Sequence, residues 1–192
     1  HPFPKNTSPW ENQAIQREFI LQNLSDANND DYIFFSDPDE IPNPEIYKDF
    51  RLKKKYGIFM QKCFNYKFNL FNGFESPWEG TRVSKKKYLK SIDFMRQKIK
   101  SKNLNYSFYR IDKEKSVQVF YDAGWHFNNI LNSKDISIKL KTFAHTEFST
   151  ENFSLISVIE ENIKKKVDLF GRGHSYKKVL IDSTFPTYLK DN

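Results

Sequence analysis

A short apolar run that ends in a cluster of acids is the feature that most constrains this sequence. Residues 32–35 read YIFF, and Asp37, Asp39 and Glu40 follow closely. A short, continuous apolar run is typical of a strand that is buried on both faces of an α/β sheet. Ligands of open α/β sheets bind beyond the carboxyl ends of the strands. We therefore expect these acids to stand at a sheet edge where a ligand can bind.

The rest of the chain alternates between helix and strand patterns. A helix is predicted from Ser8, which can cap it, through Pro9 in its first turn, with Glu11 completing a capping box. Further helices are predicted within residues 43–55, 91–102, 133–144 and 151–170, and strands within 56–71 and 116–127. The order is not a regular series of βαβ units. The sequence therefore predicts one α/β domain, residues 1–192, with a mixed sheet flanked by helices.

Charge and cysteine content narrow the classes of function. The 31 Lys and Arg residues against 24 Asp and Glu residues give a formal net charge of +7, which favours anionic partners such as nucleotides. Cys63 is the single cysteine, so an internal disulfide is excluded and a reducing, cytoplasmic setting is expected. No apolar run approaches the ~18 residues of a membrane helix, so we expect no membrane span.

The acids after residues 32–35 suggest a metal site. In an extended stretch Asp37 and Asp39 share a face, and a turn brings Glu40 back toward them. Clustered carboxylates stay ionised together only when a cation offsets their repulsion, and hard oxygen ligands suit Mg²⁺ or Mn²⁺. A metal–diphosphate site is one interpretation. The other is that the acids only cap the following turn, as Asp before Pro often does.

Two classes of enzyme carry a pair of acids, one residue apart, after a buried strand. Haloacid-dehalogenase-like phosphatases require a small hydroxyl residue two positions after the second acid, where this chain has Ile41. Nucleotide-sugar glycosyltransferases use the two acids to hold a metal on the diphosphate that leaves. The residue at position 41 does not match the first class, and a longer set of motifs decides between the two.

A longer set of motifs carries a resemblance to one family. The strings DDYIFFSDPDEIPNP, DAGWHF, IKLKTFAHTEF, DLFGR and FPTYLKDN occur in this order. Together they resemble glycosyltransferase family 17, whose best-known members are bisecting β-1,4-mannosyl-glycoprotein β-1,4-N-acetylglucosaminyltransferases. The string SPWENQAIQREF is similar to the W-x-x-E-x-x-x-R helix of that family, with Trp10, Glu11 and Arg17 near the matching places. The resemblance covers most of the chain.

The resemblance implies a GT-A-like fold and an inverting, metal-dependent transfer of GlcNAc from UDP-GlcNAc to a glycan acceptor. Mn²⁺ or Mg²⁺ is the implied cofactor. The chain departs from the family by carrying Pro38 between the two acids. It also begins after the first βαβ segment of the family, so we expect a truncated fold or a fragment of a longer chain.

Candidate site residues follow from the motifs and the resemblance. Inversion requires a carboxylate to take the proton from the acceptor hydroxyl. A tight turn at Gly124 after a strand would bring His126 to a sheet end, where it is a possible metal ligand. The expected metal ligands are Asp37, Asp39, His126 and His145; the expected donor-binding residues are Asp37, Asp39, Arg17, Trp125, His126 and Arg172; and the candidate catalytic carboxylates are Glu40, Asp122, Glu147 and Glu79.

Two other functions stay open at this point. The first is a catalytically inactive, sugar-binding remnant, which the missing upstream segment would explain. The second is a basic nucleic-acid-binding module that uses the positive charge and exposed aromatic residues. That alternative leaves the acid cluster unexplained, so we expect no nucleic acid partner. The acceptor is expected to be a microbial or viral glycan, or a lipid-linked sugar.

Overall fold

The computed structural model describes residue 4, residues 7–142 and residues 150–191. It is a mixed α/β structure in which helices flank a mixed sheet, as the sequence predicts. The chain forms two compact units. The first contains His1–Gln61 and Glu79–Gly124, and the second contains Lys62–Trp78 and Trp125–Asn192. The ten-residue strand β3 (Tyr56–Asn65) begins in the first unit and ends in the second.

The sheet of the first unit has the strand order β1-β5-β3-β6. Its strands are β1 (Tyr32–Phe35), β5 (Trp78–Lys85), the first part of β3, and β6 (Val117–Phe120). Strand β1 runs antiparallel to β5, and β6 runs parallel to β3. The short strand β2 (Glu40–Pro42) follows β1 in the chain. The sheet is therefore mixed.

Strand β1 forms where the YIFF run predicts it, but it is not buried on both faces. It ends the strand order, and only Phe35 is fully buried, while Tyr32 is 37% exposed. Phe34 packs edge-on against Tyr47 of α2 (Glu45–Lys48) and lies beside Phe50. The apolar run therefore forms a strand at the sheet edge, where it packs against aromatic side chains, and not a central strand.

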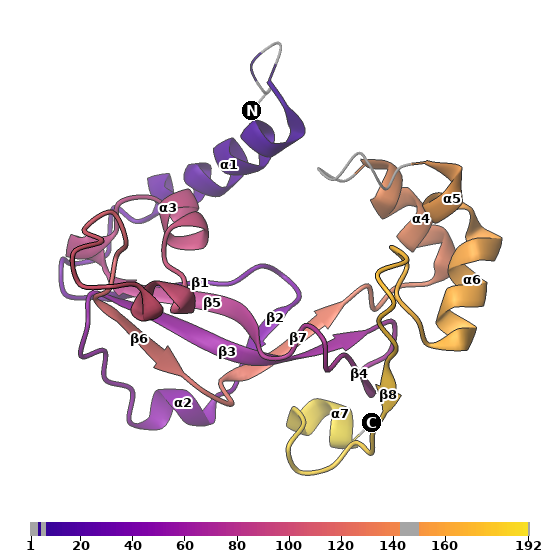
Figure 1. Ribbon diagram of the computed structural model, residues 1–192. Helices are drawn as coiled ribbons and strands as arrows, with labels where there is room; N and C mark the ends of the chain where they lie inside the picture. The colour runs from indigo at the N-terminus through magenta and orange to yellow at the C-terminus, as the bar shows by residue number, and fades with distance from the viewer. Residues whose placement is uncertain (1–3, 5–6, 143–149, 192) are drawn as a thin grey trace. The chain divides into compact units, whose positions relative to one another are not determined.

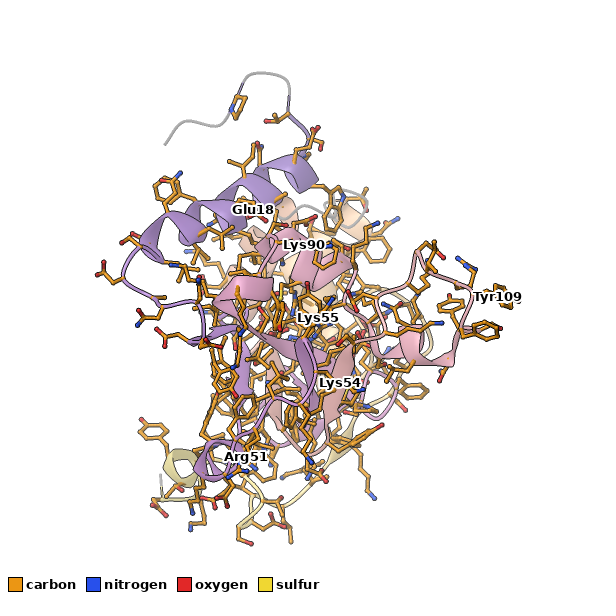
Figure 2. The ribbon with its side chains drawn as sticks, turned by 90° about the vertical axis from the view of Figure 1, so that its left-hand side faces the viewer. Glu18, Arg51, Lys54, Lys55, Lys90 and Tyr109 are labelled. Atoms are coloured by element: carbon orange, nitrogen blue, oxygen red, sulfur yellow. The ribbon has the colours of Figure 1, made fainter. Side chains whose placement is uncertain are left out.

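The predicted first helix, α1 (Pro9–Phe19), has the expected capping box. The Glu11 backbone N–H donates to Ser8 Oγ, and the Ser8 N–H donates to Glu11 Oε2. The helix continues into the 3₁₀ turn η1 (Ile20–Asn23). Glu18, labelled on α1 in Figure 2, accepts a hydrogen bond from the Asp93 N–H in α3 (Ile92–Gln97). This bond joins α1 to the first turn of α3.

Side chains alternate between two apolar layers along β3 in the first unit. Tyr56, Ile58 and Met60 pack with Met95 of α3, whereas Phe59 packs with Val83 and the aromatic cluster near α2. Figure 1 shows α3 and α2 on opposite sides of these strands. The 3₁₀ turns η2 (Lys86–Tyr88) and η3 (Ser101–Asn105) connect the remaining elements of this unit. Each face of the sheet therefore has its own apolar layer.

The loop between η3 and β6 extends away from the sheet, and Figure 2 shows Tyr109 at its outer end. Phe108 is 92% exposed and Ile111 is 95% exposed.

The sheet of the second unit has the order β7-β3-β4-β8. Its strands besides β3 are β4 (Leu70–Phe71), β7 (Gly124–Asn128) and β8 (Lys177–Lys178). Three helices, α4 (Ser133–Thr142), α5 (Glu151–Ser154) and α6 (Ile156–Lys165), lie together (Figure 1), and α7 (Thr187–Asp191) ends the chain. Leu70 packs with Ile136 and Ile159, which joins the strands to these helices. In the described part of the chain, no helix has the length and apolar character needed to cross a bilayer.

Candidate functional site

The acids after β1 form a tight turn in the first unit. The Glu40 N–H donates to the Asp37 carbonyl at 2.9 Å, which closes a β-turn with Pro38 and Asp39 at its centre. Proline suits the second position of such a turn because its φ is already fixed. The Asp37 N–H in turn donates to Glu40 Oε2 at 3.1 Å. We call the residues from Asp37 to Glu40 the acid turn.

One arginine from α3 joins two acids of this turn. Arg96 Nη2 lies 2.6 Å from Asp37 Oδ2, and Arg96 Nη1 lies 3.0 Å from Glu40 Oε1. The same Nη1 donates to the Gly80 carbonyl. Glu40 is only 2% exposed, and a buried carboxylate requires such a partner. The structure therefore positions Glu40 inside the acid turn as the ionic partner of Arg96, a contact that no motif predicts.

Arg17, predicted to contact the donor, lies beside the same turn. Its Nη2 is 3.3 Å from Asp37 Oδ2, so Asp37 contacts guanidinium groups from both α1 and α3. Asp39 is partly exposed at the corner of the turn. The guanidinium group of Arg82 also interacts electrostatically with Asp37 and Glu40, so the acid turn is flanked by positive charge.

The other candidate carboxylates of the first unit differ in their surroundings. Glu79 Oε2 lies 3.0 Å from Arg82 Nη2, and its Oε1 accepts from the Ser101 N–H. Burial of Arg82, followed by repulsion from Arg96, lowers its pKa to about 10. Asp122 is exposed, with φ +48°, in the turn that precedes β7. Asp122 is therefore open to solvent, whereas Glu79 supports Arg82.

The tight turn predicted at Gly124, with His126 at a sheet end, is not where the structure bends: the bend lies at residues 121–122, Gly124 is the first residue of β7, and His126 lies inside that strand opposite Cys63. Gly124 has φ +139°, and an added Cβ would lie 2.1 Å from the Ile41 carbonyl oxygen. Only glycine fits this backbone without strain.

Trp125 and His126 lie on opposite faces of β7 in the second unit. Trp125 is buried in an aromatic cluster with Phe64, and its Nε1 donates to the Thr184 carbonyl at 3.1 Å. His126 Nδ1 lies 3.7 Å from Cys63 Sγ, and the imidazole stacks on Trp78 with 4.5 Å between ring centres. Trp125 therefore occupies an apolar core, and His126 a buried polar site.

A buried polar network lies near His126. Glu75 Oε2 accepts from Asn72 Nδ2 at 2.7 Å, and Asn72 also donates to Asn65 Oδ1 at 3.0 Å. Arg172, predicted to contact the donor, lies 2.8 Å from Glu75 Oε1 through Nη1. Asn72 is fully buried, yet a lone asparagine in a sequence gives no signal of such a role.

Arg172 is also the partner of Asp168. Its Nη2 lies 2.6 Å from Asp168 Oδ1, and its Nε and backbone N–H both donate to Asp168 Oδ2. Burial raises the pKa of Asp168, but the hydrogen bonds from Arg172 outweigh burial and hold it below its ordinary value. The bonds from Asp168 raise the pKa of Arg172. The ion pair joins the first and last residues of the DLFGR motif, which is one of the motifs that carry the family resemblance.

We expect Asp168→Asn to lower the free energy of unfolding by about 2 kcal/mol, because charge-assisted hydrogen bonds are lost. A depressed folded-state pKa contributes stability above pH ~4, the unfolded value, and that stability is lost as pH falls through the folded value. Urea unfolding of wild type and variant from pH 7 to pH 2 measures this. The difference in free energy of unfolding between the two proteins should narrow below pH 4. A difference that stays constant with pH would contradict the depressed pKa of Asp168.

The acid turn supplies two carboxylates, Asp37 and Asp39, that could hold a divalent metal. Within the described residues, no group of three or more His, Cys, Asp or Glu side chains is placed to hold a metal ion. Asp37 and Asp39 supply hard oxygen atoms, and Mg²⁺ at phosphate sites is typically held by one or two carboxylates plus substrate oxygens. His126 belongs to the second unit. His145 and Glu147 lie outside the described residues.

Comparison of the chain with protein-family models, with curated proteins and with solved structures finds no match.

Proposed function

We propose that this chain is a metal-dependent, inverting glycosyltransferase with a GT-A-like fold, which transfers GlcNAc from UDP-GlcNAc to a hydroxyl of a glycan. The observation that carries the proposal is the acid turn, where Asp37 and Asp39 follow a strand and Arg17 and Arg96 lie against Asp37. Carboxylates and guanidinium groups at one corner suit a ligand that combines a divalent cation with a diphosphate. The family resemblance adds the donor sugar and the stereochemistry.

Each group of the acid turn has a distinct part in binding. Asp37 and Asp39 would hold Mn²⁺ or Mg²⁺, which when bound offsets the charge of the departing diphosphate. Arg17 and Arg96 lower the repulsion between the acid turn and the diphosphate. Glu40, buried against Arg96, holds the turn in shape before the ligand arrives.

The transfer itself requires a base. The acceptor oxygen attacks the anomeric carbon as the bond from that carbon to the diphosphate breaks, and a carboxylate takes the hydroxyl proton. Among the described candidates, Glu40 and Glu79 are held by arginines, whereas Asp122 is exposed. We propose Asp122 as the base, because an exposed carboxylate can meet an acceptor.

Thermal unfolding with UDP and Mn²⁺ tests the donor site. At ligand concentrations about 100 times Kd, binding to the folded state adds about 2.7 kcal/mol, or roughly 5–10 °C in Tm for a chain of this size. We expect this shift only when UDP and Mn²⁺ are both present, and its loss in EDTA. An unchanged Tm with both ligands would contradict the proposal.

An inactive sugar-binding protein is the second candidate, and one contact favours it. Asp37 already contacts both Arg17 and Arg96, so part of the acid turn is neutralised without a metal. For this function, glycan raises Tm while UDP with Mn²⁺ does not. The same experiment therefore separates the two candidates.

A further inference from the structure

A second region of the chain has the features of an anion site. In the second unit a pocket of about 750 Å³ is lined by Lys67, Lys164, Lys166 and Lys178, with Leu70 among its apolar lining. None of the described residues that were predicted to bind or transfer the sugar lines it. We propose that this pocket, here called the lysine pocket, binds a phosphorylated small molecule that carries at least two phosphate charges.

The lysines reach the pocket from separate elements of the fold. Lys67 lies in the turn between β3 and β4, Lys178 lies on β8 beside Leu70, and Lys164 and Lys166 lie at the end of α6. Positive charge at the end of α6 also stabilises the helix dipole, which accounts for two of the four lysines. It does not account for Lys67 or Lys178, so the shared pocket needs another explanation.

Acids offset only part of the charge of the pocket. Among the described residues, none of the four lysines forms a close ion pair, Glu160 is the single acid of the lining, and Lys164 interacts at longer range with Glu161. By contrast, Lys165, next to Lys164 in α6, pairs with Glu161 at 2.6 Å. Four lysines that line one pocket with a single described acid repel one another, and a bound anion lowers that repulsion.

The lining indicates the chemistry of the ligand. The volume of about 750 Å³ lies within the range of small-molecule pockets and exceeds the space that one phosphate fills. The lysines of the lining can bind phosphate groups as point charges. Leu70 and Ile163 supply apolar contacts, and Asn69 supplies an amide. A polyphosphorylated organic molecule meets each of these features.

Two double variants with equal charge test the proposal. Lys164→Gln/Lys178→Gln removes two lysines of the pocket, and Lys165→Gln/Lys177→Gln removes their neighbours on the same helix and strand. Pyrophosphate is the probe, titrated by calorimetry in EDTA so that a metal-dependent donor site does not contribute. We expect the pocket variant to bind at least about 10-fold more weakly, since each hydrogen bond to a charged group contributes substantially. The control should change less than twofold.

A third variant tests the pocket from the opposite direction. Glu160→Gln removes the acid of the lining and should tighten pyrophosphate binding several-fold, so the proposal stays testable even if the double variant unfolds. Asp39→Asn should leave this binding unchanged, which separates the lysine pocket from the proposed donor site. Equal weakening by both double variants would indicate diffuse surface charge and overturn the proposal. Absence of saturable binding to the wild type would also overturn it.

Discussion

Asp39→Asn is expected to reduce sugar transfer by about 10³-fold, because it removes a carboxylate proposed to hold the metal on the leaving diphosphate. Asn keeps the size of the side chain and its partial exposure at the corner of the acid turn. The free energy of unfolding should therefore change little. The readout is GlcNAc transfer from UDP-GlcNAc to a panel of glycans, with Mn²⁺-dependent UDP binding measured alongside.

Asp49→Asn is the matched control for Asp39→Asn. Asp49 is an exposed acid of the same unit, at the end of α2 and outside the acid turn. Transfer and UDP binding should stay at the wild-type level in this variant. If Asp39→Asn binds UDP with Mn²⁺ as tightly as wild type does, the acid turn is not the metal site.

Arg96→Met is expected to lower the free energy of unfolding by about 3 kcal/mol, the largest stability effect we predict. Met fills a similar volume but removes the guanidinium contact of Glu40, whose side chain is 1% exposed, so this buried carboxylate loses a charged hydrogen-bond donor. Asp37 keeps Arg17, so the main penalty arises at Glu40. Urea unfolding at pH 7 measures the loss.

A double-mutant cycle separates this charge effect from lost packing. Glu40→Gln in the Arg96→Met background removes the buried negative charge and should restore most of the stability. Arg110→Met is the control, since Arg110 pairs with Asp112 on the exposed surface and its removal should cause little measurable change. If the double variant is no more stable than Arg96→Met alone, buried charge is not the cause.

Local chemistry in the sequence predicted local structure well. Ser8, Pro9 and Glu11 specify a helix start through contacts within a few residues, and the capping box forms as expected. The helix predicted from residue 91 begins at Ile92, with Ser91 as its cap. Each of these features depends on neighbours along the chain.

Features that depend on distant residues were not predicted. The YIFF run indicates a strand but not its place in the sheet, because aromatic partners around α2 replace a second covering layer. Likewise Arg96 lies 56 positions after Glu40 in the chain, and nothing in its helical surroundings signals the contact. Trp125 was expected to contact the donor, whereas the structure buries it beside Phe64. Tertiary packing decided all three.

The attachment of Arg96 to α3 has a consequence for how such a protein would lose activity. Helix α3 is six residues long, well below the ~12 residues that an isolated helix needs in water. It therefore persists only while its own residue Met95 stays packed against Tyr56 and Ile58 of β3. If α3 detaches locally, Asp37 and Glu40 lose their shared guanidinium while the strands remain intact. Inactivation by heat would then begin as the release of one short helix, ahead of the collapse of the sheet.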